Sequence, residues 1–167
     1  MFDASDLSTR PVDIGIRSEG AILGELSKQG YDVLAPFSYN RRYDFVIDLG
    51  DRFVRAQCKT GRLFTGAVVF NKVSTRSSRT AVHRRAYGDD IDCFLIYCPP
   101  LDKVYAVPIA DAEKGVAMLR VEPPANAQRK RINWATDYEL GVGTRALVAL
   151  PPSPDLDSSL RRSSSAG

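Results

Sequence analysis

An acid, an amide and a lysine stand close together in the sequence, in a combination that suits a hard divalent cation. Asp44 begins one apolar segment, and Gln57, Cys58 and Lys59 lie in the next one. Carboxylate, amide and main-chain carbonyl oxygens are ligands of the kind that Mg²⁺ prefers, and the ion usually takes only one or two carboxylates from a protein. We therefore predict a Mg²⁺ site formed by Asp44, Gln57 and the main-chain carbonyl of Cys58.

An ion at this place would support hydrolysis of a phosphate ester. It would polarise the scissile phosphate and lower the pKa of a bound water, and Lys59 would supply positive charge where negative charge builds up. His83 is the one histidine of the chain, which excludes multi-histidine metal sites and leaves only that residue for Ser-His-Asp or Cys-His catalysis. Chemistry in this chain is therefore expected to rest on carboxylates, amides and lysine.

The two segments that carry these residues are predicted to form a β-hairpin. Residues 43–49 and 52–60 are rich in β-branched and aromatic residues, as strands are. Between them, Gly50 and Asp51 fit a two-residue type II′ turn, which requires glycine at its first central position.

This turn would bring the polar side chains together on one face of the hairpin. Asp44 would lie directly opposite Gln57, with Cβ atoms about 5 Å apart, and Lys59 would share their face because it lies two residues further on. The other face would be apolar and would pack against the core through Val54, Ala56 and Cys58.

A helix predicted for residues 14–29 contributes a further carboxylate. Glu19 precedes Ile22, Leu23 and Leu26 at helical spacing, so it stands at the start of the stripe that faces the sheet. A carboxylate there would bind a second ion or orient water. The alternative is an ordinary solvent-exposed glutamate, and the spacing leaves both interpretations open.

The remaining elements predict an α/β fold, a mixed β-sheet flanked by helices. Further strands are expected at residues 31–38, 66–73, 93–98 and 103–109, a loop or short helix at 74–85, and short helices at 109–115 and 132–140. Residues 1–13 are interpreted as a lead-in, 14–150 as one domain, and 151–167, which are rich in Pro, Ser and Asp, as a disordered tail.

The cysteines and the N-terminus bear on where the protein works. Cys58, Cys93 and Cys98 are an odd set, which favours free thiols over a disulfide framework. Cys93 and Cys98 would point to opposite faces of one strand, so they would not share a zinc ion. No segment is apolar enough to cross a membrane or to serve as a signal peptide. A cytoplasmic protein is expected.

Positive charge is unevenly distributed, although the net charge is only +3. Residues 52–88 contain no Asp or Glu but many Lys and Arg, a pattern typical of a surface that binds a polyanion. The alternative is a solvated basic face. The residues expected to contact nucleic-acid phosphates are Arg41, Arg42, Arg62, Arg76, Arg79, Arg84 and Arg85.

The ordered set of these features resembles the PD-(D/E)XK nucleases, and within them the branch of bacterial group I intron homing endonucleases. The resemblance is carried by Glu19 ahead of Gly30-Tyr31, then by "YDFVIDLGDRFVRAQCKTG", "IDCFLIYCPPLDKVYAVPI" and "RINWATDYEL", and it spans roughly residues 14–140. It implies a restriction-endonuclease-like core and a Mg²⁺-dependent endodeoxyribonuclease that acts on double-stranded DNA. The catalytic residues that it implies are Glu19, Asp44, Gln57 and Lys59.

One position departs from the general pattern of that superfamily. Gln57 stands where most members have Asp or Glu, although the homing branch resembles this chain in accepting Gln. One negative charge fewer should weaken metal binding. The alternatives to a homing-like nuclease are therefore a catalytically inactive DNA-binding module of the same fold, or a restriction or Holliday-junction-resolving nuclease. A homo-oligomer, dimer or tetramer, is expected for symmetric cleavage.

Overall fold

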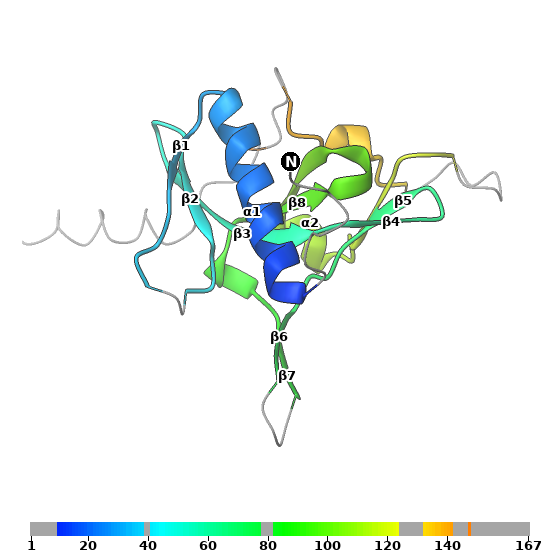
Figure 1. Cartoon of the computed structure of the whole chain (residues 1–167), viewed down its shortest axis with the longest axis horizontal. Coiled ribbons are helices and arrows are strands. Elements are labelled where there is room, and N and C mark those ends of the chain that lie inside the picture. Colours follow the sequence, from blue (N-terminus) through cyan, green and yellow to red (C-terminus); the bar gives the residue numbers. More distant parts are fainter. Residues whose placement is uncertain (1–9, 39–40, 78–81, 124–131, 142–146, 148–167) are drawn as a thin grey trace, which may run out of the picture.

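The fold is built around a mixed five-stranded sheet with a long helix across one face (Figure 1). The structure is a computed structural model, and it describes residues 10–38, 41–77, 82–123, 132–141 and 147. The predicted lead-in lies outside these residues up to residue 9, and the predicted tail, 151–167, lies outside them entirely.

Helix α1 (Pro11–Lys28) begins earlier than the apolar periodicity indicated. Proline at the first helical position has its φ angle set for a helix and lacks only an N–H that would have no partner there, so α1 extends back to Pro11. The helix ends before Gly30, whose φ of +79° an L side chain rarely adopts. Ile22 and Leu26 are fully buried, and they fix the face of α1 that packs on the sheet.

The main sheet has the strand order β1-β2-β3-β8-β9. Its strands are β1 (Asp32–Leu34), β2 (Phe45–Asp48), β3 (Phe53–Thr60), β8 (Cys93–Cys98) and β9 (Lys103–Pro108). All neighbours are antiparallel except β3 and β8, which run parallel. A parallel pair needs a long crossover connection. Here the connection between β3 and β8 includes strands that pack on the face of the sheet opposite α1.

The predicted hairpin between β2 and β3 is confirmed, including its register. Phe45 pairs with Ala56 and Asp48 with Phe53. The Leu49 N–H donates to the Arg52 carbonyl at 2.9 Å, closing the two-residue loop. Gly50 has a φ of +86°, as the first central position of a type II′ turn requires.

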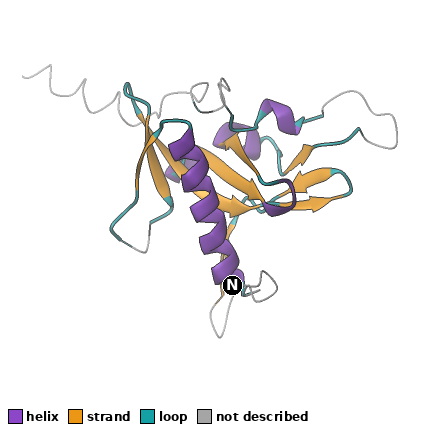
Figure 2. Ribbon diagram, turned by 45° about the horizontal axis from the view of Figure 1, so that its top comes forward, coloured by secondary structure: helices purple, strands orange, loops and turns teal. Residues whose placement is uncertain are grey.

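The face of the sheet opposite α1 is covered mainly by a second, three-stranded sheet and a short helix. The strands are β4 (Arg62–Phe64), β5 (Ala67–Val69) and β10 (Met118–Arg120), in the order β10-β5-β4, and the helix is α2 (Ile109–Glu113). These elements form a second core with the far side of β8 and β9. Figure 2 shows the long helix α1 lying across the strands of the main sheet. Strands β4 and β10 were not expected from the sequence.

Two predicted elements were wrong. Residues 74–85, expected to be a loop or short helix, contain the antiparallel strands β6 (Ser74–Ser77) and β7 (Val82–Arg85), a hairpin that projects from the body (Figure 1). Residues 132–140 form only the 3-10 turn η4 (Ala135–Asp137), because Trp134 and Glu139 on either side of it make β-bridges to Arg120 and Tyr105. In both segments the conformation is set by main-chain pairing with another strand, which local sequence periodicity does not indicate. Further 3-10 turns are η2 (Gly88–Asp90) and η3 (Pro99–Leu101).

The two cysteines of β8 point to opposite faces, as predicted. Cys93 belongs to the core beneath α1 and Cys98 to the core on the other face, and both are buried with free thiols. In the described ranges, no helix is long and apolar enough to cross a membrane.

A matched pair of glycine variants tests the turn that sets the hairpin register. Gly50→Ala places a side chain at positive φ and should lower the free energy of unfolding by about 1 kcal/mol. Gly24→Ala, in the middle of α1 where an added Cβ meets nothing within 4 Å, should raise it by roughly 0.5–1 kcal/mol. Urea unfolding measures both values. Equal effects of the same sign would contradict the assigned turn.

Candidate active site

The site forms at the start of β2, where β3 extends beyond the end of its partner strand, from Ala56 to Thr60. The Asp44 N–H donates to the Ala56 carbonyl at 2.8 Å, and this is the last main-chain bond between the two strands. In a strand, the main-chain N–H and C=O groups of every second residue point toward the same neighbouring strand. Those of Cys58 therefore point to the place where β2 would have continued.

The Asp44 carboxylate occupies that place. Its Oδ2 atom accepts the Cys58 N–H at 2.7 Å and also accepts a hydrogen bond from Nε2 of Gln57. The same Nε2 atom lies 3.4 Å from the Cys58 carbonyl oxygen. The predicted proximity of the Asp44 and Gln57 side chains is therefore confirmed, and the Cys58 carbonyl lies beside them.

The donor atoms gathered here fit a hard divalent cation. The Gln57 amide can present its oxygen in place of its nitrogen by rotation about its last bond, so the three groups can all offer oxygen. Burial raises the pKa of the Cys58 thiol well above its usual range, and the charges of Asp44 and Glu19 raise it further. The thiol therefore stays protonated, and Cys58 has only its carbonyl to offer.

An ion at this site would have little help from other side chains. The described residues contain no cluster of three or more His, Cys, Asp or Glu side chains that would hold a metal by themselves. Burial raises the pKa of Asp44, although the Cys58 N–H, the charge of Lys59 and the Gln57 amide oppose this effect. The carboxylate is thus incompletely compensated within the chain, and a bound cation would stabilise its charged form.

Helix α1 places Glu19 near this carboxylate. Burial raises the pKa of Glu19, and the charge of Asp44 raises it further. The neighbouring Ser18 is only 2% exposed, and its hydroxyl lies 2.6 Å from the Thr60 hydroxyl at the end of β3. This contact attaches α1 to the strand that carries Gln57 and Lys59. Glu19 is thus half-buried and close enough to Asp44 for their charges to interact, and its role at the site stays a prediction.

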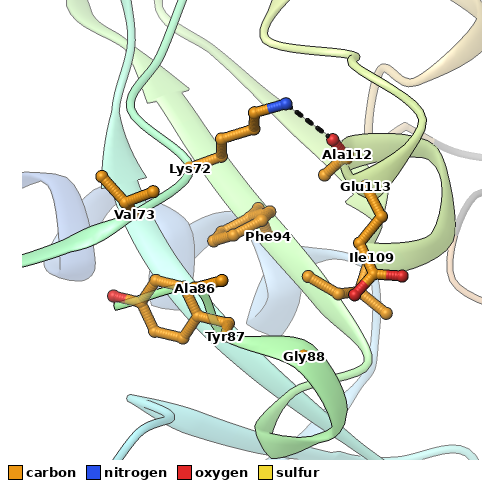
Figure 3. Close-up of a pocket in the computed structure, with 9 residues that line it drawn as sticks. All are labelled: Lys72, Val73, Ala86, Tyr87, Gly88, Phe94, Ile109, Ala112 and Glu113. Carbon is orange, nitrogen blue, oxygen red and sulfur yellow. Dashed lines mark hydrogen bonds between the residues drawn. The ribbon is translucent and has the colours of Figure 1, made fainter. Parts of the chain in front are cut away.

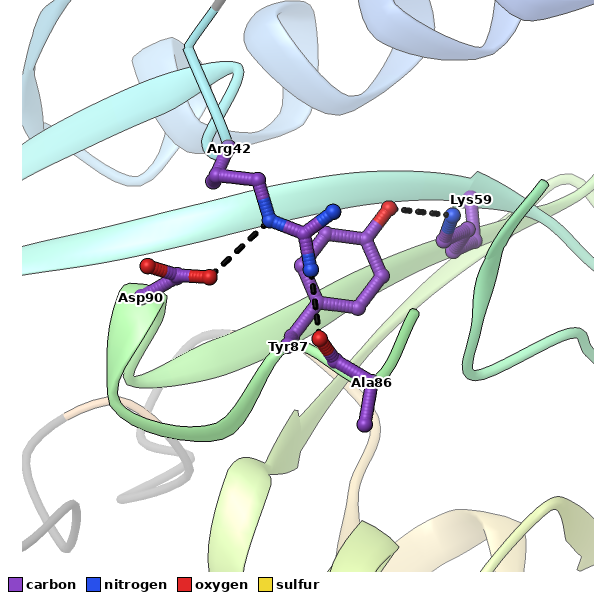
Figure 4. Close-up of polar contacts among 5 residues, drawn as sticks. All are labelled: Arg42, Lys59, Ala86, Tyr87 and Asp90. Carbon is purple, nitrogen blue, oxygen red and sulfur yellow. Dashed lines mark hydrogen bonds and ion pairs between the residues drawn. The ribbon is translucent and has the colours of Figure 1, made fainter. Parts of the chain in front are cut away.

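Lys59 is held by a tyrosine that the sequence analysis did not single out. Its ammonium donates to the Tyr87 hydroxyl at 2.9 Å and lies 4.9 Å from the centre of the Tyr87 ring (Figure 4). The two residues are 28 positions apart, so no local spacing could have indicated the contact. The only signal in the sequence is an aromatic residue at the end of the acid-free segment.

The arginines expected to contact phosphates differ in their surroundings. Arg42 is half-buried and donates to Asp90 at 3.0 Å and to the Ala86 carbonyl at 2.6 Å. Arg41 is exposed, and so is Arg62 on β4. The side chains of the other four lie outside the described residues; these four are Arg76, Arg79, Arg84 and Arg85.

Behind Tyr87, at the base of the β6–β7 hairpin, lies a mostly apolar cavity of about 250 Å³ (Figure 3). The Phe94 ring and the side chains of α2 line it, and the Lys72 ammonium crosses its rim to the Ala112 carbonyl at 2.9 Å. Tyr87 therefore has open space on one side and Lys59 on another.

Comparisons with known proteins agree with this architecture. Residues 10–141 match the family described as PD-(D/E)XK endonuclease. Among solved structures, a bacterial homing endonuclease, I-Ssp6803I, matches with a TM-score of 0.62 and 24% sequence identity, over 79% of this chain and 89% of that one. This likeness is one of fold. A search of curated proteins found no match.

The donor set can be tested by metal binding in the absence of substrate. Gln57→Glu adds a carboxylate beside Asp44 and should strengthen Mn²⁺ or Mg²⁺ binding about tenfold or more, whereas Asp44→Asn should abolish it. Isothermal titration calorimetry measures both. Asp51→Asn, which removes the same charge from an exposed turn residue, should leave the affinity unchanged. Unaltered binding by the Asp44 variant would rule out this site.

Proposed function

Because the chain belongs to the PD-(D/E)XK endonuclease family, we propose that it is a Mg²⁺-dependent endonuclease that hydrolyses phosphodiester bonds in double-stranded DNA. The observation that carries this proposal is the convergence of the Asp44 carboxylate, the Gln57 amide and the Cys58 carbonyl at the end of β2. In the proposed site these three groups bind the ion, and Glu19 and Lys59 complete the catalytic set.

Each residue then has a separate task. The ion, when bound, supplies Lewis-acid polarisation of the scissile phosphate and an acidified water. Asp44 and Gln57 hold it on the rim of the sheet, and Glu19 orients the attacking water from the helix. The Lys59 ammonium stabilises the negative charge that builds on the phosphate during attack. It can do so because it lies near Asp44 and uses an uncharged partner, Tyr87.

The basic segment supplies the affinity for DNA in this proposal. Contacts to phosphates position a protein on the duplex without reading its sequence. Arg41 and Arg62 have exposed side chains suited to such contacts. The β6–β7 hairpin, which carries Arg76, Arg84 and Arg85, projects from the body where a duplex could reach it (Figure 1). Arg79, which lies outside the described residues, and Arg42, which stands two residues before Asp44, complete the proposed contact set.

Biological role and assembly follow from the same reasoning. The matched solved structure is of a homing endonuclease, and we propose a homing-like activity for this chain in the cytoplasm. Two active sites related by symmetry would cut the two strands of a duplex at equivalent positions, which favours a homo-oligomer, a dimer or tetramer.

A second candidate function is supported by one residue. Gln57 provides no negative charge where a second carboxylate would strengthen metal binding. A DNA-binding module that has lost catalysis would have the same fold and the same basic surface. Cleavage assays separate the two functions.

Cleavage of plasmid DNA in Mg²⁺ tests the catalytic set. Asp44→Ala and Lys59→Ala should each abolish cleavage, because one removes the carboxylate that holds the ion and the other removes the charge that stabilises the transition state. Both variants should still bind DNA, since most phosphate contacts lie elsewhere.

Two further variants serve as controls for this assay. Asp51→Ala alters an exposed turn residue, and Lys103→Ala alters a lysine paired with Glu139 at the far edge of the sheet. Both should cut like the parent chain. Full cleavage by either active-site variant would overturn the assignment, and a parent chain that binds DNA without cutting it would favour the inactive module. The same assay with a branched DNA substrate would detect the activity of a Holliday-junction-resolving nuclease.

The salt dependence of DNA binding tests whether the arginines in and around the β6–β7 hairpin contact DNA phosphates. Replacing Arg76, Arg79, Arg84 and Arg85 with Gln should weaken binding at low salt and reduce the slope of log affinity against log salt by about 0.9 for each phosphate that the variant no longer neutralises. Fluorescence anisotropy with a labelled duplex gives the slope. A slope equal to that of the parent would place the DNA on another surface.

A further inference from the structure

Tyr87 connects three segments that meet behind the proposed catalytic lysine. It follows β7, at the point where the chain returns from the projecting hairpin, and it is only 5% exposed. Its hydroxyl accepts the hydrogen bond from Lys59, and the Arg42 guanidinium lies 4.3 Å from the centre of its ring (Figure 4). Arg42 stands two residues before Asp44, so the tyrosine contacts the chain on both sides of the proposed metal site.

Arg42 is itself held on two sides. Its Nε atom donates to Asp90 in η2 at 3.0 Å, and its Nη2 atom donates to the Ala86 carbonyl at 2.6 Å. The guanidinium plane therefore stays over the Tyr87 ring, in the cation–π geometry that fixes both partners. These contacts join the segment before β2 to the turn after β7.

Packing alone does not fix the Tyr87 ring. Phe94 meets it edge-on, with ring centres 5.3 Å apart, but the cavity of about 250 Å³ adjoins it as well (Figure 3). A side chain next to an empty volume is held by fewer dispersion contacts than one in a filled core. Arg42 and the hydrogen bond to Lys59 therefore add to the packing of the second core in holding the ring.

A hydroxyl is a suitable partner for a lysine that must act on a phosphate. A carboxylate in the same place would neutralise the ammonium and compete with the phosphate for it. The Tyr87 oxygen takes one of the three N–H donors and leaves both the charge and the other two donors available. The long lysine side chain loses its freedom of movement while its charge remains uncompensated by this partner.

We propose that Tyr87 is a positioning residue, which fixes the Lys59 ammonium at the active site and is in turn held by Arg42, whose guanidinium is anchored by Asp90. The inference rests on the proposed endonuclease function in assigning catalysis to Lys59. It adds that the position of the Lys59 ammonium is set by the turn after the β6–β7 hairpin as well as by β3. Tyr87 acts through Lys59 and does not itself contact the phosphate.

Tyr87→Phe removes only the hydroxyl and keeps the ring between Arg42 and Phe94. In the full chain with Mg²⁺ and duplex DNA, kcat should fall about tenfold to a hundredfold, because the ammonium is no longer held where the charge develops. The KM for DNA, the affinity for Mn²⁺ and the unfolding midpoint should stay at parent values. A role in folding or in DNA binding would change the last three quantities instead.

Tyr97→Phe is the matched control. It deletes a hydroxyl that makes a 2.9 Å hydrogen bond to Asp102, away from the site, and it should leave kcat unchanged. Arg42→Gln should lower kcat at saturating DNA as well, while the loss of its proposed phosphate contact should raise KM. The kcat of the double variant with Tyr87→Phe should be hardly below that of the slower single variant, because both changes release the same lysine. Multiplied effects in the double variant would show that Arg42 and Tyr87 act separately and would overturn the chain of contacts.

The order of the Lys59 side chain provides a readout that does not need cleavage. NMR relaxation of the lysine side chains, with Lys59 assigned through Lys59→Arg, should show a rigid Lys59 in the parent and a mobile one in Tyr87→Phe. If the parent does not cut DNA, the endonuclease proposal fails while this measurement still decides whether Tyr87 positions Lys59. Equal mobility in the two proteins, or an unchanged kcat in an active one, would overturn the inference.

Discussion

The central constraint in this molecule is the unequal length of two paired strands. Strand β2 begins at Phe45, whereas β3 runs on to Thr60 and pairs with β8 on its other side. A strand without its neighbour leaves main-chain groups without a partner, and burying them so is costly. The Asp44 carboxylate takes the place of the missing strand by accepting the Cys58 N–H. The requirement that completes the sheet therefore also puts a carboxylate at its rim.

That solution creates an electrostatic problem. Asp44 and Glu19 lie near each other in a partly buried place, and burial raises the pKa of both. The charge of Lys59 and the hydrogen bonds from the Cys58 N–H and the Gln57 amide lower the pKa of Asp44, but the effect of burial is larger. Completion of the sheet accounts for Asp44, but it does not account for a second carboxylate, that of Glu19, beside it. The arrangement is understandable if the missing charge is supplied from outside the chain, as in the proposed function.

The site draws its residues from segments on both sides of the sheet. Helix α1 brings Glu19 from one face through the contact between Ser18 and Thr60. The turn after the β6–β7 hairpin brings Tyr87 from the other face to the Lys59 ammonium. The β2–β3 hairpin lies between them and provides the rest. The β6–β7 hairpin, proposed to bind DNA, and Lys59, proposed to be catalytic, are thereby connected through a few residues.

The sequence by itself determined the hairpin and the residues that meet across it. A glycine turn and an approximate alternation of apolar and polar residues are local signals, and they set the register that brings Asp44 to Gln57. Tertiary structure decided the partner of Lys59, the strands β4 and β10, and the β-bridges on either side of the 3-10 turn η4. These depend on contacts between residues far apart in the chain. Such contacts produce no periodic pattern in the sequence, because they form between residues that become neighbours only when the chain folds.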